Sequence, residues 1–372
     1  MGDFEFNEKD ERDEHGERNL PDGSGGTEPG NRPDEPGGVA TVRSYKDVCA
    51  RLGFVMSVYF ICRILGGMIT GLLVGLSGDI GRTAVYIMSM SVTVIMVYIV
   101  PLLATAIVFK SFRHYGEAGG LRALYKKPRR LARALGTFPA MYGLGYGIAL
   151  LTLLISYLIS RVTGGQTFIE DLFRPTAADP STSVANAVVM VFLLVIVAPV
   201  LEEIWVRGIM YDALKPYGCG IAIVISSILF GLMHGSMHML FYTTALGFAL
   251  GYIRYATDSL FVVTILHAII NAVAAGLLLI SALAGSVYGE SRLFNTVFNI
   301  YILAMLILIV VGVIAFIMRI PVIRKYKIEN VWSEISPGRK TALFFMSIPV
   351  IIMLVSAFNE HTNDWLRSLI MV

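Results

Sequence analysis

Long apolar stretches, separated by short polar segments, fill most of the chain from about residue 50 onward. A helix of about 20 apolar residues is needed to cross the hydrocarbon core of a bilayer, so each long stretch predicts a transmembrane helix. The pattern therefore predicts an all-α fold, a polytopic helical bundle with about eight or nine spans. The stretches are 52–76, 84–109, 137–160, 185–214, 219–239, 241–254, 259–284, 294–318 and 341–358.

The composition divides the chain into an apolar body and a polar tail. Apolar residues make up 55% of the 372 residues and charged residues 15%. The mean hydropathy of +0.68 is too high for an ordinary soluble domain. The first 40 residues differ, with 12 acidic and 4 basic side chains and many Gly and Pro. Because this segment has so little apolar surface to bury, we expect a disordered acidic tail.

Basic side chains in the loops predict the orientation, because Lys and Arg concentrate in cytoplasmic loops. Eight basic residues lie between Lys110 and Arg133, and six lie between Arg319 and Lys340. The loops that alternate with these two are poor in basic residues. We therefore expect both basic loops and the N-terminus to be cytoplasmic.

Three charged residues interrupt the fourth apolar stretch, in "APVLEEIWVRGIM", although charges inside a bilayer are rare and costly. Glu203 and Arg207 are four residues apart and share a helical face, which predicts an internal ion pair. Glu202 points about 100° away and lacks this partner. Facing a wet cavity, Glu202 could act as a general base. The simpler alternative is a protonated carboxyl group that hydrogen-bonds to a neighbouring helix.

Two later stretches carry further polar residues at helical spacing. In "SSILFGLMHGSMH", Phe230, His234 and His238 recur every four residues. In "LHAIINAV", His267 and Asn271 are also four residues apart. Paired N–H donors of this kind suit an oxyanion hole, which stabilises the negative charge of a tetrahedral intermediate.

The polar residues of the three stretches fall at similar depths. With about 1.5 Å of rise per residue, Glu202, His234, His267 and Asn271 all lie in one slab of the predicted bundle. A shared depth is what a common site requires. The alternative is that these side chains only join neighbouring helices by hydrogen bonds and ion pairs.

These three motifs resemble those of a known family. "EEIWVRG" resembles the EExxxR motif, "FGLMH" the FxxxH motif and "HAIIN" the HxxxN motif of the CAAX prenyl protease and bacteriocin-processing family. This family, also called the Abi family, consists of intramembrane glutamic endopeptidases. The order of the motifs and their separation of about 30 residues match as well. The resemblance extends roughly from Val184 to Ala284.

The resemblance implies a catalytic role for four residues. Glu202 and His234 would activate a water molecule for attack on a peptide carbonyl. His267 and Asn271 would stabilise the resulting oxyanion. No cofactor is then required.

Glu203 and Arg207 match the remaining polar positions of the first motif, and their predicted ion pair gives them a supporting role.

The resemblance also suggests how the chain is organised. We expect a disordered acidic cytoplasmic tail, N-terminal transmembrane helices with a basic cytoplasmic loop, a catalytic core and C-terminal transmembrane helices. These parts cover residues 1–42, 43–183, 184–284 and 285–372.

A zinc-dependent membrane peptidase is one alternative. His234 and His238 have the i, i+4 spacing that binds zinc in HExxH proteases, although no glutamate lies between them. A third ligand would have to be His267 or Glu202 from another helix. His238 is extra to the family pattern, and we expect a structural role for it.

A non-enzymatic membrane protein is the other alternative, because a fold and its motifs can persist where the role is only binding. Such a protein could be a scaffold or an immunity factor. A transporter would be favoured by inverted repeats with broken helices, and the sequence has no convincing repeat. The complete set of four motif residues favours an enzyme.

The expected partners follow from these interpretations. We expect a peptide or protein substrate, with membrane-anchored and prenylated substrates included, and the lipid bilayer itself, but no nucleic acid. The resemblance and the lack of organelle signals indicate the plasma membrane of a prokaryote, with several spans and a cytoplasmic N-terminus.

Overall fold

Helices make up most of the part of the chain that the computed structural model describes, and this part contains no β-strand. The described residues are 40–77, 81–110, 125, 128, 131–163, 183–234, 237–283, 292–325, 328, 334–347 and 349–355. Most of the predicted acidic tail and of the basic loop after Lys110 therefore lies outside the described residues.

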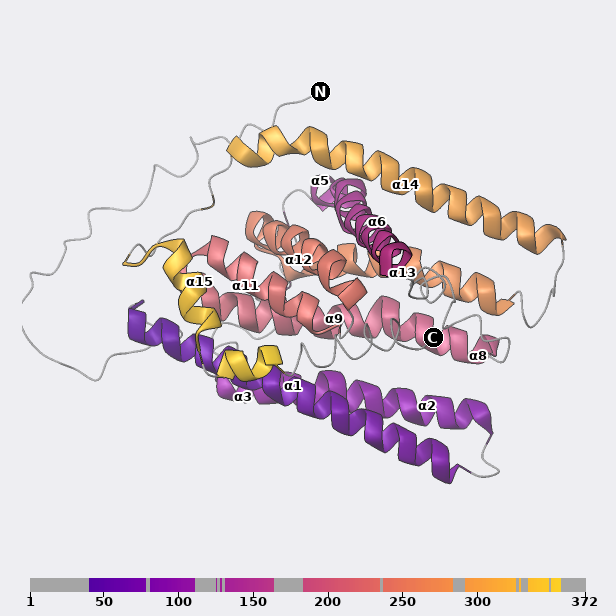
Figure 1. Cartoon of the computed structure of the whole chain (residues 1–372), viewed down its shortest axis with the longest axis horizontal. Helices are drawn as coiled ribbons and strands as arrows, with labels where there is room; N and C mark the ends of the chain where they lie inside the picture. The colour runs from indigo at the N-terminus through magenta and orange to yellow at the C-terminus, as the bar shows by residue number, and fades with distance from the viewer. Residues whose placement is uncertain are drawn as a thin grey trace, which may run out of the picture.

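The long helices lie side by side and form one bundle (Figure 1). Along one edge run α1 and a second span that consists of α2, the π-helix η1 and α3, whereas α14 runs along the opposite edge. The helices α8 to α13 lie between these edges. The bounds of the first group are α1 (Val42–Leu76), α2 (Arg82–Thr93), η1 (Val94–Ile99), α3 (Val100–Val108), α5 (Leu131–Leu135) and α6 (Phe138–Thr163).

One helical span in the middle of the bundle alternates between α-helical and π-helical segments. It is composed of α8 (Val184–Phe192), the π-helix η3 (Leu193–Val197), α9 (Ala198–Glu203), the π-helix η4 (Ile204–Met210) and α10 (Tyr211–Leu214). It is followed by η5 (Lys215–Tyr217), α11 (Cys219–Leu232), α12 (Met237–Thr257), α13 (Leu260–Leu283), α14 (Arg292–Lys325) and α15 (Pro337–Phe345).

Helices occur at all nine predicted positions, so the all-α polytopic bundle is confirmed. Among the described residues, six helices are long and apolar enough to cross a membrane, or seven if the bent pair Pro337–Phe345 and Pro349–Val355 counts as one span. With 14 residues, α11 is too short. The 21-residue α12 is not among the six. It packs against both α11 and α6, so protein rather than lipid surrounds much of it.

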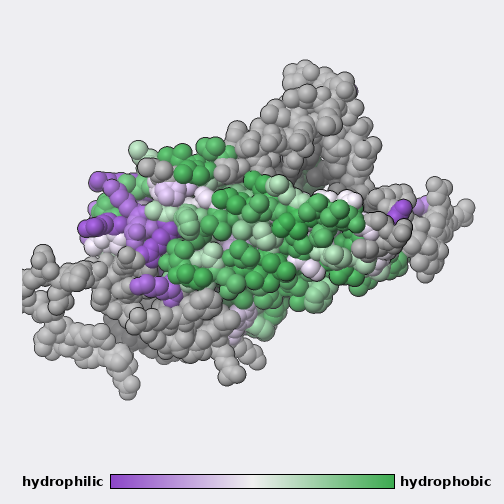
Figure 2. Space-filling view, turned by 90° about the horizontal axis from the view of Figure 1, so that it is seen from below, coloured by the Kyte–Doolittle hydropathy of each residue, from purple (hydrophilic) through white to green (hydrophobic). Residues whose placement is uncertain are grey.

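The outer helices turn apolar side chains outward, as lipid requires. In α14, only 11% of an apolar segment of 18 residues is buried within the protein. In α1, Met68 and Leu72 are more than half exposed. Figure 2 shows hydrophobic residues across the middle of one face and hydrophilic residues gathered at one end of it. This distribution is that of a multi-pass membrane protein.

Glycines bring helices into close contact where the bundle is densest. A Cβ atom on Gly143 of α6 would collide with the backbone of Gly312 in α14. A Cβ atom on Gly247 of α12 would lie 3.0 Å from the Cα atom of Ser227 in α11. Small residues allow this approach, which is how helices commonly pack within membranes.

Candidate active site

The helix that carries the two glutamates contains π-helical turns on both sides of them. In η3, the N–H group of Ala198 donates to the carbonyl of Leu193, five residues back. In the same register, the donor for the carbonyl of Leu194 would be Pro199, which has no N–H group. The proline therefore leaves this carbonyl without its helical partner. Such π-bulges are frequent at functional sites.

Asn271 of α13 supplies the missing donor. Its Nδ2 atom lies 2.8 Å from the carbonyl oxygen of Leu194. Asn271, which was predicted to stabilise the oxyanion, thus contacts the π-helical turn η3 of the neighbouring helix. Sequence reasoning missed this contact, although Pro199 within an apolar run was a signal that a backbone carbonyl would need a donor.

Glu203 and Arg207 lie in a fully buried cluster. Arg207 Nη1 is 3.0 Å from Glu203 Oε1, and both side chains are 0% exposed. Arg207 Nη2 also donates to the carbonyl of Gly247 at 3.3 Å, where α12 comes close to its neighbour. His267 Nδ1 lies 2.8 Å from the same Glu203 oxygen. We call Glu203, Arg207 and His267 the buried cluster.

The aromatic ring of Phe230 packs against several of these polar side chains. Arg207 Cζ lies 4.2 Å from the centroid of the Phe230 ring, a cation–π contact. The edge-to-face contacts of Phe230 with His234 and His267 have centroid distances of 4.8 and 5.6 Å. Phe230 thus positions residues from all three motifs. In the sequence, Phe230 was a member of a helical face and the first residue of the FxxxH motif, but no contact was predicted for it.

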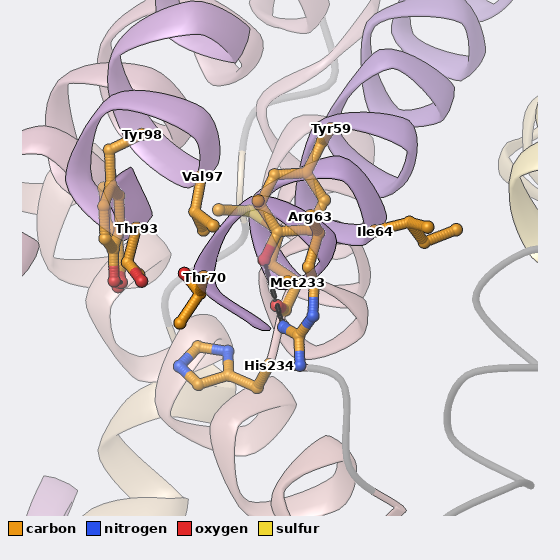
Figure 3. A pocket seen from close by; sticks show the side chains of 12 residues that line it. Tyr59, Arg63, Ile64, Thr70, Thr93, Val97, Tyr98, Met233 and His234 are labelled. Carbon is orange, nitrogen blue, oxygen red and sulfur yellow. Dashed lines mark hydrogen bonds between the residues drawn. The ribbon is translucent and has the colours of Figure 1, made fainter. Parts of the chain in front are cut away.

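Glu202 faces a different environment, a cavity of about 530 Å³. Its Oε1 atom accepts a hydrogen bond from the Tyr98 hydroxyl at 3.2 Å. Its Oε2 atom lies 3.8 Å from His267 Nε2. Figure 3 shows the cavity, with Tyr98 on one side of it and Tyr59 on another. The lining residues are Tyr59, Arg63, Ile64, Gly66, Gly67, Thr70, Thr93, Val97, Tyr98, Glu202, Met233 and His234.

The tautomer of His234 follows from its hydrogen bond. His234 Nδ1 lies 2.8 Å from the carbonyl oxygen of Phe230. Because a carbonyl only accepts, Nδ1 must carry the proton, and Nε2 of the neutral ring then has a lone pair. His234 also lines the cavity beside Glu202. The cavity is therefore lined by the carboxyl group of Glu202 and by a histidine whose Nε2 atom can accept a hydrogen bond.

The described residues contain no group of three or more His, Cys, Asp or Glu that could hold a metal ion. The side chain of His238 lies outside the described part of the structure. The proposed zinc pair of His234 and His238 therefore remains a sequence-based alternative.

Comparison with known families assigns the central part of the chain. Residues 184–273 match the model of the Rce1-like family, described as type II CAAX prenyl endopeptidase Rce1-like. The matched segment contains all seven residues that the three motifs specify. Neither a curated protein nor a solved structure matches the chain. Residues 184–273 of this multi-pass membrane protein therefore match a family of CAAX-type proteases, in agreement with the resemblance of the three motifs.

Proposed function

We propose that this protein is a glutamic endopeptidase that hydrolyses a peptide bond inside the membrane, with Glu202 as the general base. The observation that carries the proposal is that Glu202 and His234 line the same cavity, whereas the adjacent Glu203 is fully buried in an ion pair. A base needs access to water and substrate, and the cavity that Glu202 lines would provide this access.

The reaction begins with a water molecule held by Glu202 and by Nε2 of His234. Glu202 takes one proton as the water oxygen attacks the substrate carbonyl, and the C–O bond forms. The carbonyl oxygen becomes an oxyanion. Glu202 then returns the proton to the leaving nitrogen as the C–N bond breaks, which gives a carboxylic acid and an amine.

His267 and Asn271 are the proposed oxyanion donors. His267 Nδ1 is directed at Glu203, so donation to the oxyanion requires a second proton on Nε2. The amide of Asn271 has two N–H bonds, and one of them is used on Leu194. The other is assigned to the oxyanion. Loss of one such donor typically lowers the rate by about 10² to 10³.

The proposed substrate is a membrane-anchored protein or peptide, and the family description favours one with a prenylated cysteine in a C-terminal C-a-a-X sequence. The reaction would then take place in the plasma membrane of a prokaryote, on the cytoplasmic side. The acidic tail would lie on that side as well.

The test is cleavage of a quenched fluorogenic peptide that ends in a farnesylated cysteine followed by three residues. Wild-type protein and Glu202→Gln, purified in detergent, are compared at equal amounts of folded protein. We expect cleavage by the wild type only, and equal activity of both proteins would overturn the proposal. Membrane peptides from cells with either protein would reveal natural substrates.

A chelator added to the wild-type reaction separates the two peptidase mechanisms. A reaction of Glu202 and water should continue at the same rate. Loss of activity that zinc restores would instead favour a metal site at His234 and His238. A scaffold or immunity protein would cleave nothing in either condition.

A further inference from the structure

Arg63 brings a positive charge into the candidate active site. It lies within the apolar helix α1, where a charged side chain is costly and usually functional. Its guanidinium group lines the cavity that also contains Glu202 and His234 (Figure 3). The Nη1 atom donates to the carbonyl oxygen of Met233 at 3.1 Å and lies 3.4 Å from the Tyr59 hydroxyl.

Part of the reason for this position is structural. The Met233 carbonyl follows the last residue of α11, where helical carbonyls lack their usual partners. A cation near a helix C-terminus is also favourable. However, the hydroxyl of Tyr59 donates to the same carbonyl. A neutral donor therefore already serves the helix end, and a guanidinium group within the membrane is more than this end requires.

We propose that Arg63 binds a carboxylate of the substrate and thereby selects peptides with a carboxylate close to the scissile bond. The proposal rests on the proposed function, because Glu202 and His234 of the same cavity would perform the hydrolysis. The hydrogen bond to the carbonyl of Met233, the residue before His234, holds the guanidinium group close to the candidate active site. Arginine suits this role because its planar group presents donors in the geometry of a carboxylate.

The carboxylate could be the substrate's C-terminal group or an acidic side chain. A cavity of about 530 Å³ is within the usual range for small-ligand sites, about 300–1,000 Å³, so it would hold a short piece of chain. A residue extends by at most about 3.5 Å. The carboxylate would therefore belong to a residue within a few positions of the scissile bond.

The experiment uses three versions of the farnesylated peptide: a free C-terminal acid, a C-terminal amide, and the amide with Asp as its last residue. Cleavage is measured as kcat/KM, and binding is measured separately as Kd with Glu202→Gln, which holds peptide without hydrolysis. We expect wild-type protein to favour the free acid over the amide by about 10- to 100-fold. In Arg63→Gln, the acid should fall to the level that the same variant shows for the amide, so the preference should disappear.

Two further variants separate carboxylate binding from support of the helix end. Arg63→Lys keeps the charge without the planar fork, and we expect part of the preference to remain. Tyr59→Phe removes the other donor to Met233, and we expect the preference to persist in full. An equal loss for acid and amide in Arg63→Gln would overturn the proposal and leave only the helix-end role.

The outcome with the third peptide identifies the source of the carboxylate. Strong cleavage of the Asp-containing amide would support a side-chain carboxylate, and weak cleavage would support the C-terminal group. The absence of all cleavage by the wild type would contradict the proposed function, whereas the Kd values would still test Arg63. Equal Kd values for acid, amide and Asp-containing amide would overturn the carboxylate site, whether or not hydrolysis occurs.

Discussion

Two adjacent glutamates of one helix lie in opposite surroundings. Glu203 is 0% exposed and makes close contacts with Arg207 and His267. Glu202 is 7% exposed, accepts from Tyr98 and lines the cavity. One step along a helix turns a side chain by about 100°, which is enough to move a carboxylate from packed protein to a cavity. A buried charge requires a fixed partner, whereas a general base requires access to water and substrate.

His267 joins the two environments. Its Nδ1 atom contacts Glu203 at 2.8 Å, and its Nε2 atom lies 3.8 Å from Glu202. The buried cluster thus orients a ring whose other nitrogen faces the proposed base. Changes to Glu203 or Arg207 should act mainly on folding, and changes at the cavity should act mainly on rate.

The largest effect should come from Glu202→Gln. The substitution keeps the size of the side chain and a hydrogen bond with Tyr98, but it removes the base. Because general-base catalysis typically contributes about 10² to 10⁴ in rate, we expect peptide cleavage to fall by at least this factor. Activity is measured per folded protein, and thermal unfolding in detergent is the control. A large fall in melting temperature, enough to explain the loss of activity by unfolding, would contradict the catalytic role of Glu202.

Glu203→Gln should instead lower stability. Arg207 would remain buried without its carboxylate, and breaking a buried ion pair costs about 3–5 kcal/mol. We expect a lower melting temperature and less folded protein in the membrane. The double substitution Glu203→Gln, Arg207→Met should recover part of this loss, because no unpaired charge then remains. Normal stability of Glu203→Gln with complete loss of cleavage would place Glu203 in catalysis.

Asn271→Ala should lower both stability and rate, since Asn271 has a structural contact as well as a proposed catalytic role. Leaving the Leu194 carbonyl without a donor should cost about 1–3 kcal/mol. Adding Pro199→Ala restores a backbone N–H group for this carbonyl. We therefore expect the double variant to regain melting temperature but not cleavage activity. Recovery of both would show that Asn271 is only a structural donor.

The local features of the site could be predicted from the sequence. The four-residue spacing of Glu203 and Arg207 predicted an ion pair, which the structure contains at 3.0 Å. Apolar stretches predicted the helices, and the three motifs predicted the family. These predictions depend only on spacing along one helix or on short sequence patterns, so they do not require knowledge of how helices pack.

The remaining features depend on contacts between distant parts of the chain. Arg63 and Met233 are 170 residues apart, and Asn271 and Leu194 are 77 apart. Neither spacing rules nor depth estimates predict which side chain reaches which carbonyl. The π-helical turns shift the register of the residues that follow them, and the only sign of η3 in the sequence is Pro199. The sixth apolar stretch, 241–254, predicted a short span, and α12 is not among the described helices that are long and apolar enough to cross a membrane.

The smallest effect should come from Asp47→Asn, which is the matched control for Glu203→Gln. Asp47 and Arg51 have the same four-residue spacing and the same 3.0 Å separation as the buried pair, but Asp47 is 46% exposed. Exposed pairs of this spacing contribute about 0.3–0.5 kcal/mol, because water screens the charges. We expect a melting temperature within about 2 °C of the wild type and unchanged cleavage. Equal destabilisation by Asp47→Asn and Glu203→Gln would mean that burial is not what distinguishes the two pairs, and the contrast between the buried cluster and the cavity would lose its physical basis.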